Sequence, residues 1–183
     1  MKYTPQSIPE VLLLEPKVYG DERGYFTETF RQDLFEELLG FEINFIQDNE
    51  SKSAKGVLRG LHYQLPPFSQ AKLVRVVDGS ILDVVVDIRK NSSNFGRHLS
   101  VKLTSDNKRQ LFIPKGFAHG FIVLSETAIF SYKVDNYYSA AHEQGLAFND
   151  PELGINWQVD IKDIKLSDKD NKYPKLSDAI YLL

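Results

Sequence analysis

The sequence predicts an all-β fold, an antiparallel sandwich or barrel, on three observations. Several short segments alternate apolar and polar residues with a period of two, as half-buried strands do. Turn-forming groups of Gly, Asn, Asp, Ser and Pro separate these segments at short intervals. Only one segment has the longer apolar spacing of a helix. Many short strands with few helices are typical of sandwiches and barrels.

The one clear helix candidate covers residues 32–39. Its apolar side chains, Leu34, Phe35, Leu38 and Leu39, recur at helical spacing. Gly40 follows at the position where a glycine commonly ends a helix. We therefore expect one short peripheral helix here.

The middle of the chain predicts the strands. In residues 97–104, Leu99, Val101 and Leu103 share one face, and the residues between them are polar. Residues 81–88 are largely apolar on both faces, so Asp83 is expected to point into an enclosed space. Further short strands are predicted at residues 57–64, 72–77, 110–113, 120–124 and 128–134.

Length and composition predict one domain over residues 1–183, with the segment from Asn149 onward wrapped around the barrel. The net charge of -3 gives no basic surface typical of a general nucleic-acid binder. The chain has no cysteine, which excludes disulfides, thiolate catalysis and sulfur-ligated metal clusters. No apolar run is long enough for a signal peptide or a membrane span, so a cytoplasmic protein is expected.

Two histidines suggest a barrel without a metal site. The segment around His119, Pro-Lys-Gly-Phe-Ala-His-Gly-Phe, resembles half of the cupin signature. In metal-binding cupins the other half supplies two histidines one residue apart and a glutamate, whereas here His62 is followed by Tyr63 and Gln64. Two imidazoles are a thin ligand set for a first-row metal. We therefore expect a cupin-type jelly-roll barrel with a few short peripheral helices and no metal, although His119 could also be a strand residue that only tightens a turn.

Four segments together resemble the dTDP-4-dehydrorhamnose 3,5-epimerase family. They are Arg-Gly-Leu-His-Tyr-Gln at residues 59–64, Asp-Val-Val-Val-Asp-Ile-Arg at 83–89, Ile-Pro-Lys-Gly-Phe-Ala-His-Gly-Phe at 113–121 and Asn-Asp-Pro at 149–151. Their order and spacing match over residues 9–174. Departures such as Phe148 in place of a tryptophan lie in loops and leave open whether C3, C5 or both carbons are epimerised.

The resemblance implies a dTDP-linked 4-keto-6-deoxyhexose as substrate, no cofactor and no metal. Protons at C3 and C5 are acidic because both carbons flank the C4 ketone, so a base on one face and an acid on the other can invert each centre through an enolate.

The family match gives the catalytic residues. His62 is the base, since histidine titrates near neutrality. Asp170, at the last position of Ser-Asp-Lys-Asp, would fix its tautomer, with Asp168 a nearby competitor. Tyr132 is the acid, although alone it would read as a core aromatic. Lys72 would stabilise the enolate oxygen.

Twelve further positions match the family's substrate-binding residues. Arg23 and Arg59 would hold the diphosphate through their planar guanidinium groups. Phe26 and Tyr138 are candidates for stacking on thymine. The others shape the nucleotide and sugar pockets and are Glu28, Gln47, Asp48, Asn49, Asp83, His119, Glu143 and Lys169.

Arg59 and His62 would face opposite ways in a regular strand, yet both belong in one pocket. A bulge at Gly60 would reconcile them, because glycine tolerates the backbone angles of a bulge. An irregularity at Gly60 is therefore predicted.

Three alternatives remain at this point. The protein could epimerise a single carbon of another dTDP-4-keto deoxysugar, use a metal whose third ligand is not evident, or bind sugars without catalysis. The resemblance also implies a homodimer, in which N-terminal strands carrying Arg23 and Phe26 could reach the partner's pocket.

Overall fold

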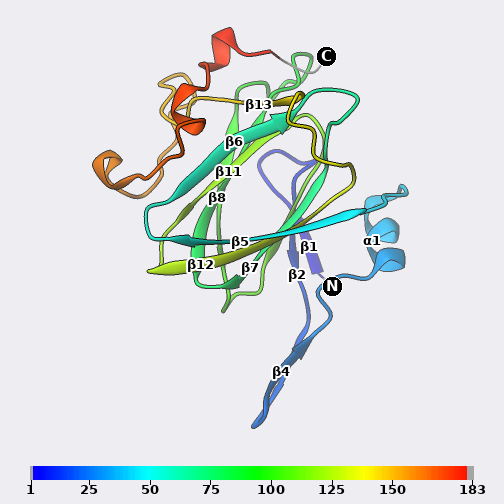
Figure 1. The fold of residues 1–183 in the computed structure, drawn as a ribbon. Coiled ribbons are helices and arrows are strands. Elements are labelled where there is room, and N and C mark those ends of the chain that lie inside the picture. The colour runs from blue at the N-terminus through cyan, green and yellow to red at the C-terminus, as the bar shows by residue number, and fades with distance from the viewer. Residues whose placement is uncertain (1, 181–183) are drawn as a thin grey trace.

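In the computed structural model, which describes residues 2–180, the chain folds into two stacked antiparallel sheets, a detached two-stranded ribbon and one α-helix (Figure 1). The strands are β1 (Lys2–Pro5), β2 (Leu12–Glu15), β3 (Val18–Asp21), β4 (Gly24–Thr27), β5 (Gln47–Ala54), β6 (Leu58–Gln64), β7 (Lys72–Asp78), β8 (Ser80–Asp87), β9 (His98–Thr104), β10 (Gln110–Ile113), β11 (Phe117–Val123), β12 (Thr127–Val134) and β13 (Glu143–Gly145). The helices are α1 (Gln32–Leu39) and the short 3-10 turns η1 (Ile161–Asp163), η2 (Asp170–Lys172) and η3 (Leu176–Asp178).

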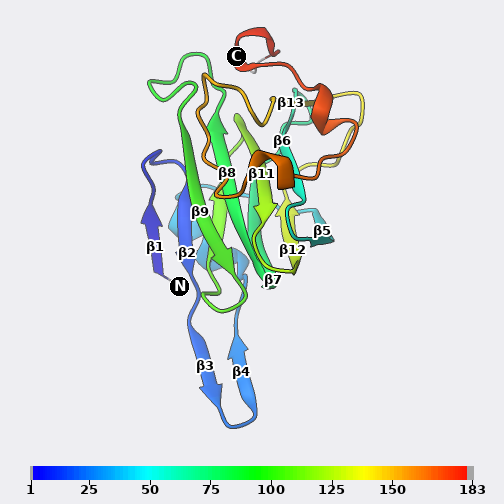
Figure 2. The ribbon, with the colours of Figure 1, turned by 90° about the vertical axis from the view of Figure 1, so that its left-hand side faces the viewer.

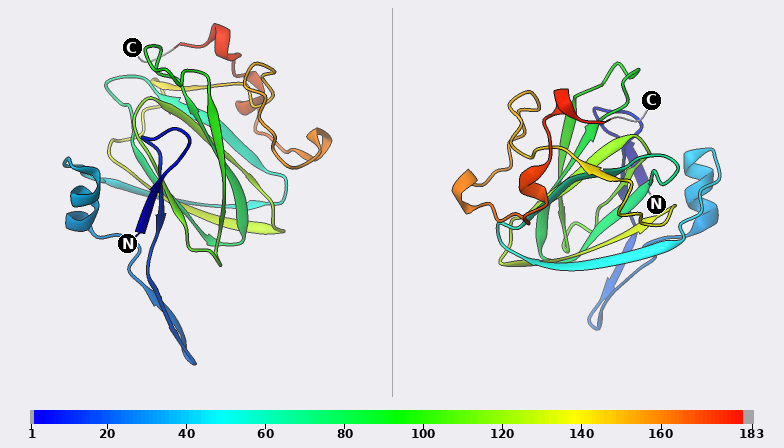
Figure 3. Two further views of the ribbon diagram at one scale, coloured as in Figure 1. Left: turned by 180° about the vertical axis from the view of Figure 1, so that it is seen from behind. Right: turned by 45° about the horizontal axis from the view of Figure 1, so that its top comes forward.

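The two main sheets form the predicted jelly roll. One sheet has the order β1-β2-β10-β7-β12-β5, and the other has the order β13-β6-β11-β8-β9. Neighbours such as β12 and β5, or β11 and β8, pair although they are distant along the chain. Figure 3 shows both sheets from behind and from above, with α1 on one side of the barrel and the C-terminal segment on the other.

Apolar side chains from both sheets fill the interior of the barrel. Val74 and Phe130 come from one sheet, and Ile81, Val85 and Phe121 come from the other. Fully burying each such side chain stabilises the fold by roughly 1.5–3 kcal/mol. Among these side chains, the buried polar residues Asp83 and His119 also lie in the interior.

The C-terminal segment packs on the outer face of the five-stranded sheet. Leu82, Val84 and Val86 of β8 point outward and pack with Trp157 and Leu176. This packing explains why β8 is apolar on both faces. It also brings the late part of the chain alongside β6.

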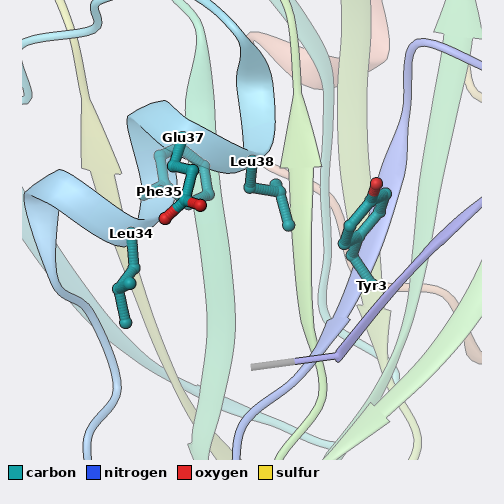
Figure 4. A pocket seen from close by; sticks show the side chains of 5 residues that line it. All are labelled: Tyr3, Leu34, Phe35, Glu37 and Leu38. Atoms are coloured by element: carbon teal, nitrogen blue, oxygen red, sulfur yellow. The ribbon is translucent and has the colours of Figure 1, made fainter.

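Helix α1 covers the outer face of the six-stranded sheet and confirms the predicted bounds. Phe35 packs with Leu73 and Phe112 of the sheet. Gly40 ends the helix in the left-handed conformation, with φ 74°, and its N–H donates to the carbonyl oxygen of Glu36 at 2.8 Å. A groove lies beside the helix; its lining residues are Tyr3, Leu34, Phe35, Glu37 and Leu38 (Figure 4).

Strands β3 and β4 form a ribbon that projects away from the barrel (Figure 2). Its aromatic side chains Tyr19, Tyr25 and Phe26 are exposed, and Phe26 is 68% accessible. A two-stranded hairpin is marginally stable in water when nothing packs against it. We therefore expect the ribbon to contribute little stability by itself.

All seven predicted strands are present, but one begins earlier than predicted, and six further strands, β1 to β5 and β13, were not predicted. The strand predicted at residues 120–124 begins at Phe117, because Phe117 and Ala118 already pair with Asp87 and Val86 of β8. β5 was not predicted, since its sequence is polar on both faces. Among residues 2–180, no helix is long and apolar enough to cross a membrane.

Candidate active site

A cavity of about 350 Å³ is lined by residues of both sheets. Its lining residues are Asn49, Glu50, Ser51, Arg59, His62, Lys72, His119, Phe121, Phe130, Tyr132, Tyr138, Glu143 and Lys169. The groove beside α1 is similar in size, but Glu37 is the one charged side chain that lines it. The cavity between the sheets is the candidate active site because it gathers a histidine, a phenol and a lysine.

His62 and Asp170 form a close pair at one wall. His62 Nε2 lies 2.5 Å from Asp170 Oδ1, and the Asp170 side chain is only 5% exposed. Ser167 Oγ donates to the other carboxylate oxygen at 2.8 Å. Burial alone would raise the pKa of Asp170, but the hydrogen bonds from His62 and Ser167 outweigh it and hold the pKa below its usual value. Asp168 takes no part in this pair.

A bulge in β6 brings Arg59 and His62 to the same side, as predicted. His62 pairs with His119 and Arg59 with Phe121, so three residue steps on β6 face two on β11. Gly60 has φ 124°, and a Cβ atom there would lie 2.5 Å from the Cα of Gly120. Glycine is therefore required both by the backbone angle and by the close approach of β11.

Arg59 is anchored by one nitrogen. Its Nε donates to Ser53 Oγ at 3.0 Å, and Ser53 is a buried residue of β5. This contact orients the guanidinium plane toward the cavity and leaves its terminal nitrogens available for a ligand.

Tyr132 faces the cavity from the opposite sheet. It belongs to β12, whereas His62 belongs to β6, so the two side chains stand on different walls. Its ring lies 5.6 Å from that of Phe130. Burial raises the pKa of the Tyr132 phenol, with the positive charge of Arg59 acting in the opposite sense. The phenol thus keeps its proton at neutral pH.

A buried charged cluster forms the floor. His119 Nε2 lies 2.9 Å from Asp83, which is fully buried inside the barrel as expected. Burial raises the pKa of Asp83 and lowers that of His119. Burial also lowers the pKa of Lys72 to about 8, although the carboxylates of Asp83 and Glu143 oppose this shift. Lys72 therefore remains mostly protonated at neutral pH.

At the mouth, Glu143 accepts hydrogen bonds from two segments. Lys169 Nζ lies 2.8 Å from both carboxylate oxygens, and the Tyr138 hydroxyl donates at 2.8 Å. Burial would raise the pKa of Glu143, but these two donors lower it. The bonds link the loop after β12, β13 and the C-terminal segment around the opening.

The predicted nucleotide-binding residues of β5 divide between two faces, because successive side chains of a strand alternate. Gln47 Nε2 donates to Asn49 Oδ1 at 2.9 Å on the cavity side, and the Tyr138 N–H donates to Gln47. Asp48 faces away and pairs with Lys133 at 2.9 Å. Asp48 is therefore not brought into this cavity, and Gln47 does not line it directly but contacts the lining residues Asn49 and Tyr138.

Three predicted binding residues lie elsewhere in this single chain. Arg23 is at the tip of the β3–β4 ribbon, 85% exposed and paired with Asp21. Phe26 is on the same ribbon, and Glu28 follows it directly. None of them lines the cavity formed by its own chain.

Sequence reasoning missed several residues around the cavity. Phe121 and Phe130 line it, and their alternation with His119 and Tyr132 along β11 and β12 could have revealed them. Glu50 and Ser51 were missed because β5 itself was not recognised. Within residues 2–180, no group of three His, Asp or Glu side chains is arranged to hold a metal ion.

The fold and this cavity define the class: a cupin-type jelly-roll barrel with a cavity between its sheets that is lined by ionisable side chains. The family model described as dTDP-4-dehydrorhamnose 3,5-epimerase matches residues 5–178. The chain belongs to the dTDP-4-dehydrorhamnose 3,5-epimerase family.

Individual relatives agree over nearly the whole chain. The dTDP-4-dehydrorhamnose 3,5-epimerase of Shigella flexneri is 54% identical over 183 residues, all of both chains. The crystal structure of that enzyme from Elizabethkingia anophelis NUHP1 is similar with a TM-score of 0.95 and 48% identity, covering 99% of each chain. The 3,5-epimerase of Legionella pneumophila Philadelphia 1, solved in complex with dTDP-4-keto-L-rhamnose, is similar with a TM-score of 0.93 and 48% identity, covering 96% of this chain and 93% of that one.

Proposed function

We propose that this protein epimerises C3 and C5 of dTDP-4-dehydro-6-deoxy-D-glucose to give dTDP-4-dehydro-L-rhamnose, a step of dTDP-L-rhamnose biosynthesis. The observation that carries the proposal is that His62 and Tyr132 line one cavity from opposite sheets. A ring held between them has its two faces exposed to different groups. Inversion next to a ketone needs this arrangement, since the proton leaves one face and returns to the other.

In the proposed reaction, His62 removes the proton from the carbon next to the ketone. Its hydrogen bond to Asp170 fixes the imidazole and stabilises the imidazolium formed by the transfer. The charge of Lys72 stabilises the enolate oxygen from the floor of the cavity, close to Asp83 and His119. Tyr132 then protonates the carbon from the other face.

The diphosphate and nucleoside would extend from the sugar toward the cavity mouth. Arg59, fixed by Ser53, is placed to bind the diphosphate. Tyr138, Glu143 and Lys169 surround the opening, and Gln47 and Asn49 lie beside them on β5. We assign these side chains to substrate binding, together with Asp83 and His119 at the floor.

We further propose a homodimer, in which Arg23 and Phe26 serve the partner's cavity, and we assign Glu28 and Asp48 to the nucleotide pocket. The exposed aromatic residues of the projecting β3–β4 ribbon support this, because a second copy would cover them. We also infer that residues 1–183 act as one domain, and that the protein is cytoplasmic, with which the lack of cysteine is compatible. Sedimentation with and without substrate tests the dimer: a monomer with full substrate affinity would contradict it.

Solvent exchange tests the reaction. The protein is incubated with dTDP-4-keto-6-deoxyglucose in heavy water, and NMR locates the deuterium. We expect label at both C3 and C5, and no label with His62→Ala. Label at one carbon alone would indicate a single-carbon epimerase, and full exchange by the His62→Ala variant would show that another group is the base. Tyr132→Phe is the matched variant for the acid: it should exchange protons while forming little inverted product.

A further inference from the structure

Tyr173 packs against His62, the proposed base. Its ring centroid is 5.6 Å from that of His62, and the two planes meet at 69°. Such an edge-on contact is a favoured geometry for aromatic pairs. The family resemblance did not single out Tyr173, and it does not line the cavity.

The backbone of β13 is shaped to hold this ring. Gly145 stands opposite His62 in the pairing of β13 with β6. A Cβ atom on Gly145 would lie 2.5 Å from two carbons of the Tyr173 ring. The ring therefore packs directly on the glycine backbone, in space that any side chain at position 145 would occupy.

Tyr173 and Asp170 come from the same short segment. Asp170 begins the 3-10 turn η2, and Tyr173 is the residue that ends it. Asp170 holds a ring nitrogen of His62 at 2.5 Å, while Tyr173 contacts the same imidazole through its ring. A single rigid turn thus restrains His62 by two contacts of different kinds.

The contact depends on the ring rather than on the hydroxyl. Among residues 2–180, the Tyr173 oxygen is a buried side-chain atom without a hydrogen-bond partner. Burial raises the pKa of this phenol to about 12, and the negative charge of Glu143 adds to the effect. The hydroxyl is thus neutral at neutral pH. Lys169 lies close enough to oppose this pKa shift, but the contact does not have hydrogen-bond geometry, so the packing of the ring on His62 and Gly145 is the better-defined contact.

We propose that Tyr173 is a positioning residue that, with Asp170, holds the imidazole of His62 in the orientation needed for proton abstraction. The inference rests on the proposed role of His62 as the base. A free imidazole could rotate about its side-chain bonds and satisfy Asp170 in more than one orientation. The Tyr173 ring, seated on Gly145, blocks that rotation.

The test compares Tyr173→Phe, which keeps the ring, with Tyr173→Ala, which removes it. We expect the Phe variant to keep kcat within about twofold. The Ala variant should lose roughly tenfold or more in kcat with KM changed less than twofold, because a misplacement of about 1 Å in a catalytic group can cost a hundredfold. Tyr3→Ala, on the far groove, is the matched control and should leave kcat unchanged.

A spectroscopic readout separates positioning from general loss of structure. The chain has four histidines, so ¹⁵N-labelled imidazoles can be assigned by comparison with His62→Ala. We expect one tautomer for His62 in the wild type and in Tyr173→Phe, and averaged tautomer signals in Tyr173→Ala. If Tyr173→Ala does not fold, Gly145→Ala supplies the same test, since its methyl group must displace the ring.

The outcomes distinguish the two proposals. If the wild type exchanges no sugar protons, the proposed function fails, while the tautomer of His62 still reports on Tyr173. If the wild type is active and Tyr173→Ala keeps both kcat and a single His62 tautomer, the positioning role is wrong and the function stands. Equal losses in the Phe and Ala variants would also overturn it, because the ring would then not be the active part.

Discussion

Replacing Lys72 by methionine should make the protein more stable and almost inactive. The pKa of Lys72 falls from 10.5 to about 8 in the folded protein, because burial penalises its charge. At about 1.4 kcal/mol for each pKa unit, the charged lysine costs about 3 kcal/mol at pH 7. Partial contact with water reduces this cost, so we expect Lys72→Met to gain roughly 1–3 kcal/mol.

The gain should depend on pH in a defined direction. Below about pH 8, Lys72 is charged in both the folded and the unfolded chain, and the full cost is present. Between about 8 and 10.5 the unfolded chain binds the additional proton, so wild-type stability rises with pH and the advantage of Lys72→Met shrinks. Asp83, whose pKa burial already raises, can take up a proton when Lys72 is removed.

Urea denaturation at pH 7 and pH 10 measures this difference, and solvent-deuterium exchange measures the activity. We expect kcat to fall by roughly 100- to 1000-fold, as when a single donor to a developing oxyanion is removed. Lys52→Met, an exposed position on β5, is the control and should change stability by less than about 0.5 kcal/mol. If Lys72→Met gained the same stability at both pH values, the charge of Lys72 would not be the cause of the gain.

Two other substitutions test the supports of the site. Asp170→Asn should lower kcat by roughly 10- to 100-fold with little change in KM, because it removes a charge-assisted hydrogen bond worth about 1.5–3 kcal/mol; unchanged exchange kinetics would argue against the pair. Ser53→Ala frees Arg59 Nε and should raise KM several-fold while kcat stays near the wild-type value, as followed by initial rates over substrate concentration; an effect on kcat alone would assign Ser53 a different role.

The sequence could predict the elements whose burial leaves a periodic pattern. β9 and α1 were predicted because one face of each is apolar, and β8 because both of its faces are. The interior position of Asp83 also followed from the apolar residues around it. In each case the pattern reports a contact with a core, which is information that the local sequence carries.

β5 shows why the rest was not predictable. Its sequence, Gln-Asp-Asn-Glu-Ser-Lys-Ser-Ala, has no apolar stripe, yet all eight residues pair with β12. The inward side chains Asn49 and Ser51 meet the cavity, and Ser53 meets Arg59. A strand that faces a binding site instead of a core loses the alternation by which strands are recognised.

The candidate site could not be predicted from local sequence either, since its residues come from both sheets and from the C-terminal segment. Motif matching named His62, Tyr132 and Asp170, but their separation of up to 108 positions gave no local sign that His62 and Asp170 touch. Tyr173 was not predicted because its proposed contact with His62 depends on Gly145, which pairs with His62 across the sheet. Contacts of this kind are visible only once the strand register is known.

The pKa shifts of the ionisable groups differ between the floor and the mouth of the cavity. At the floor, burial lowers the pKa of Lys72 and raises that of Asp83, so both ionised forms are disfavoured there. At the mouth, hydrogen bonds with Lys169 keep the pKa of Glu143 low, and its charge is favoured. The buried charge of Lys72 is disfavoured in the resting protein, and in the proposed reaction it gains a negatively charged partner when the enolate forms. In the proposed reaction, the binding energy that Lys72 does not realise in the resting fold would be available to the transition state.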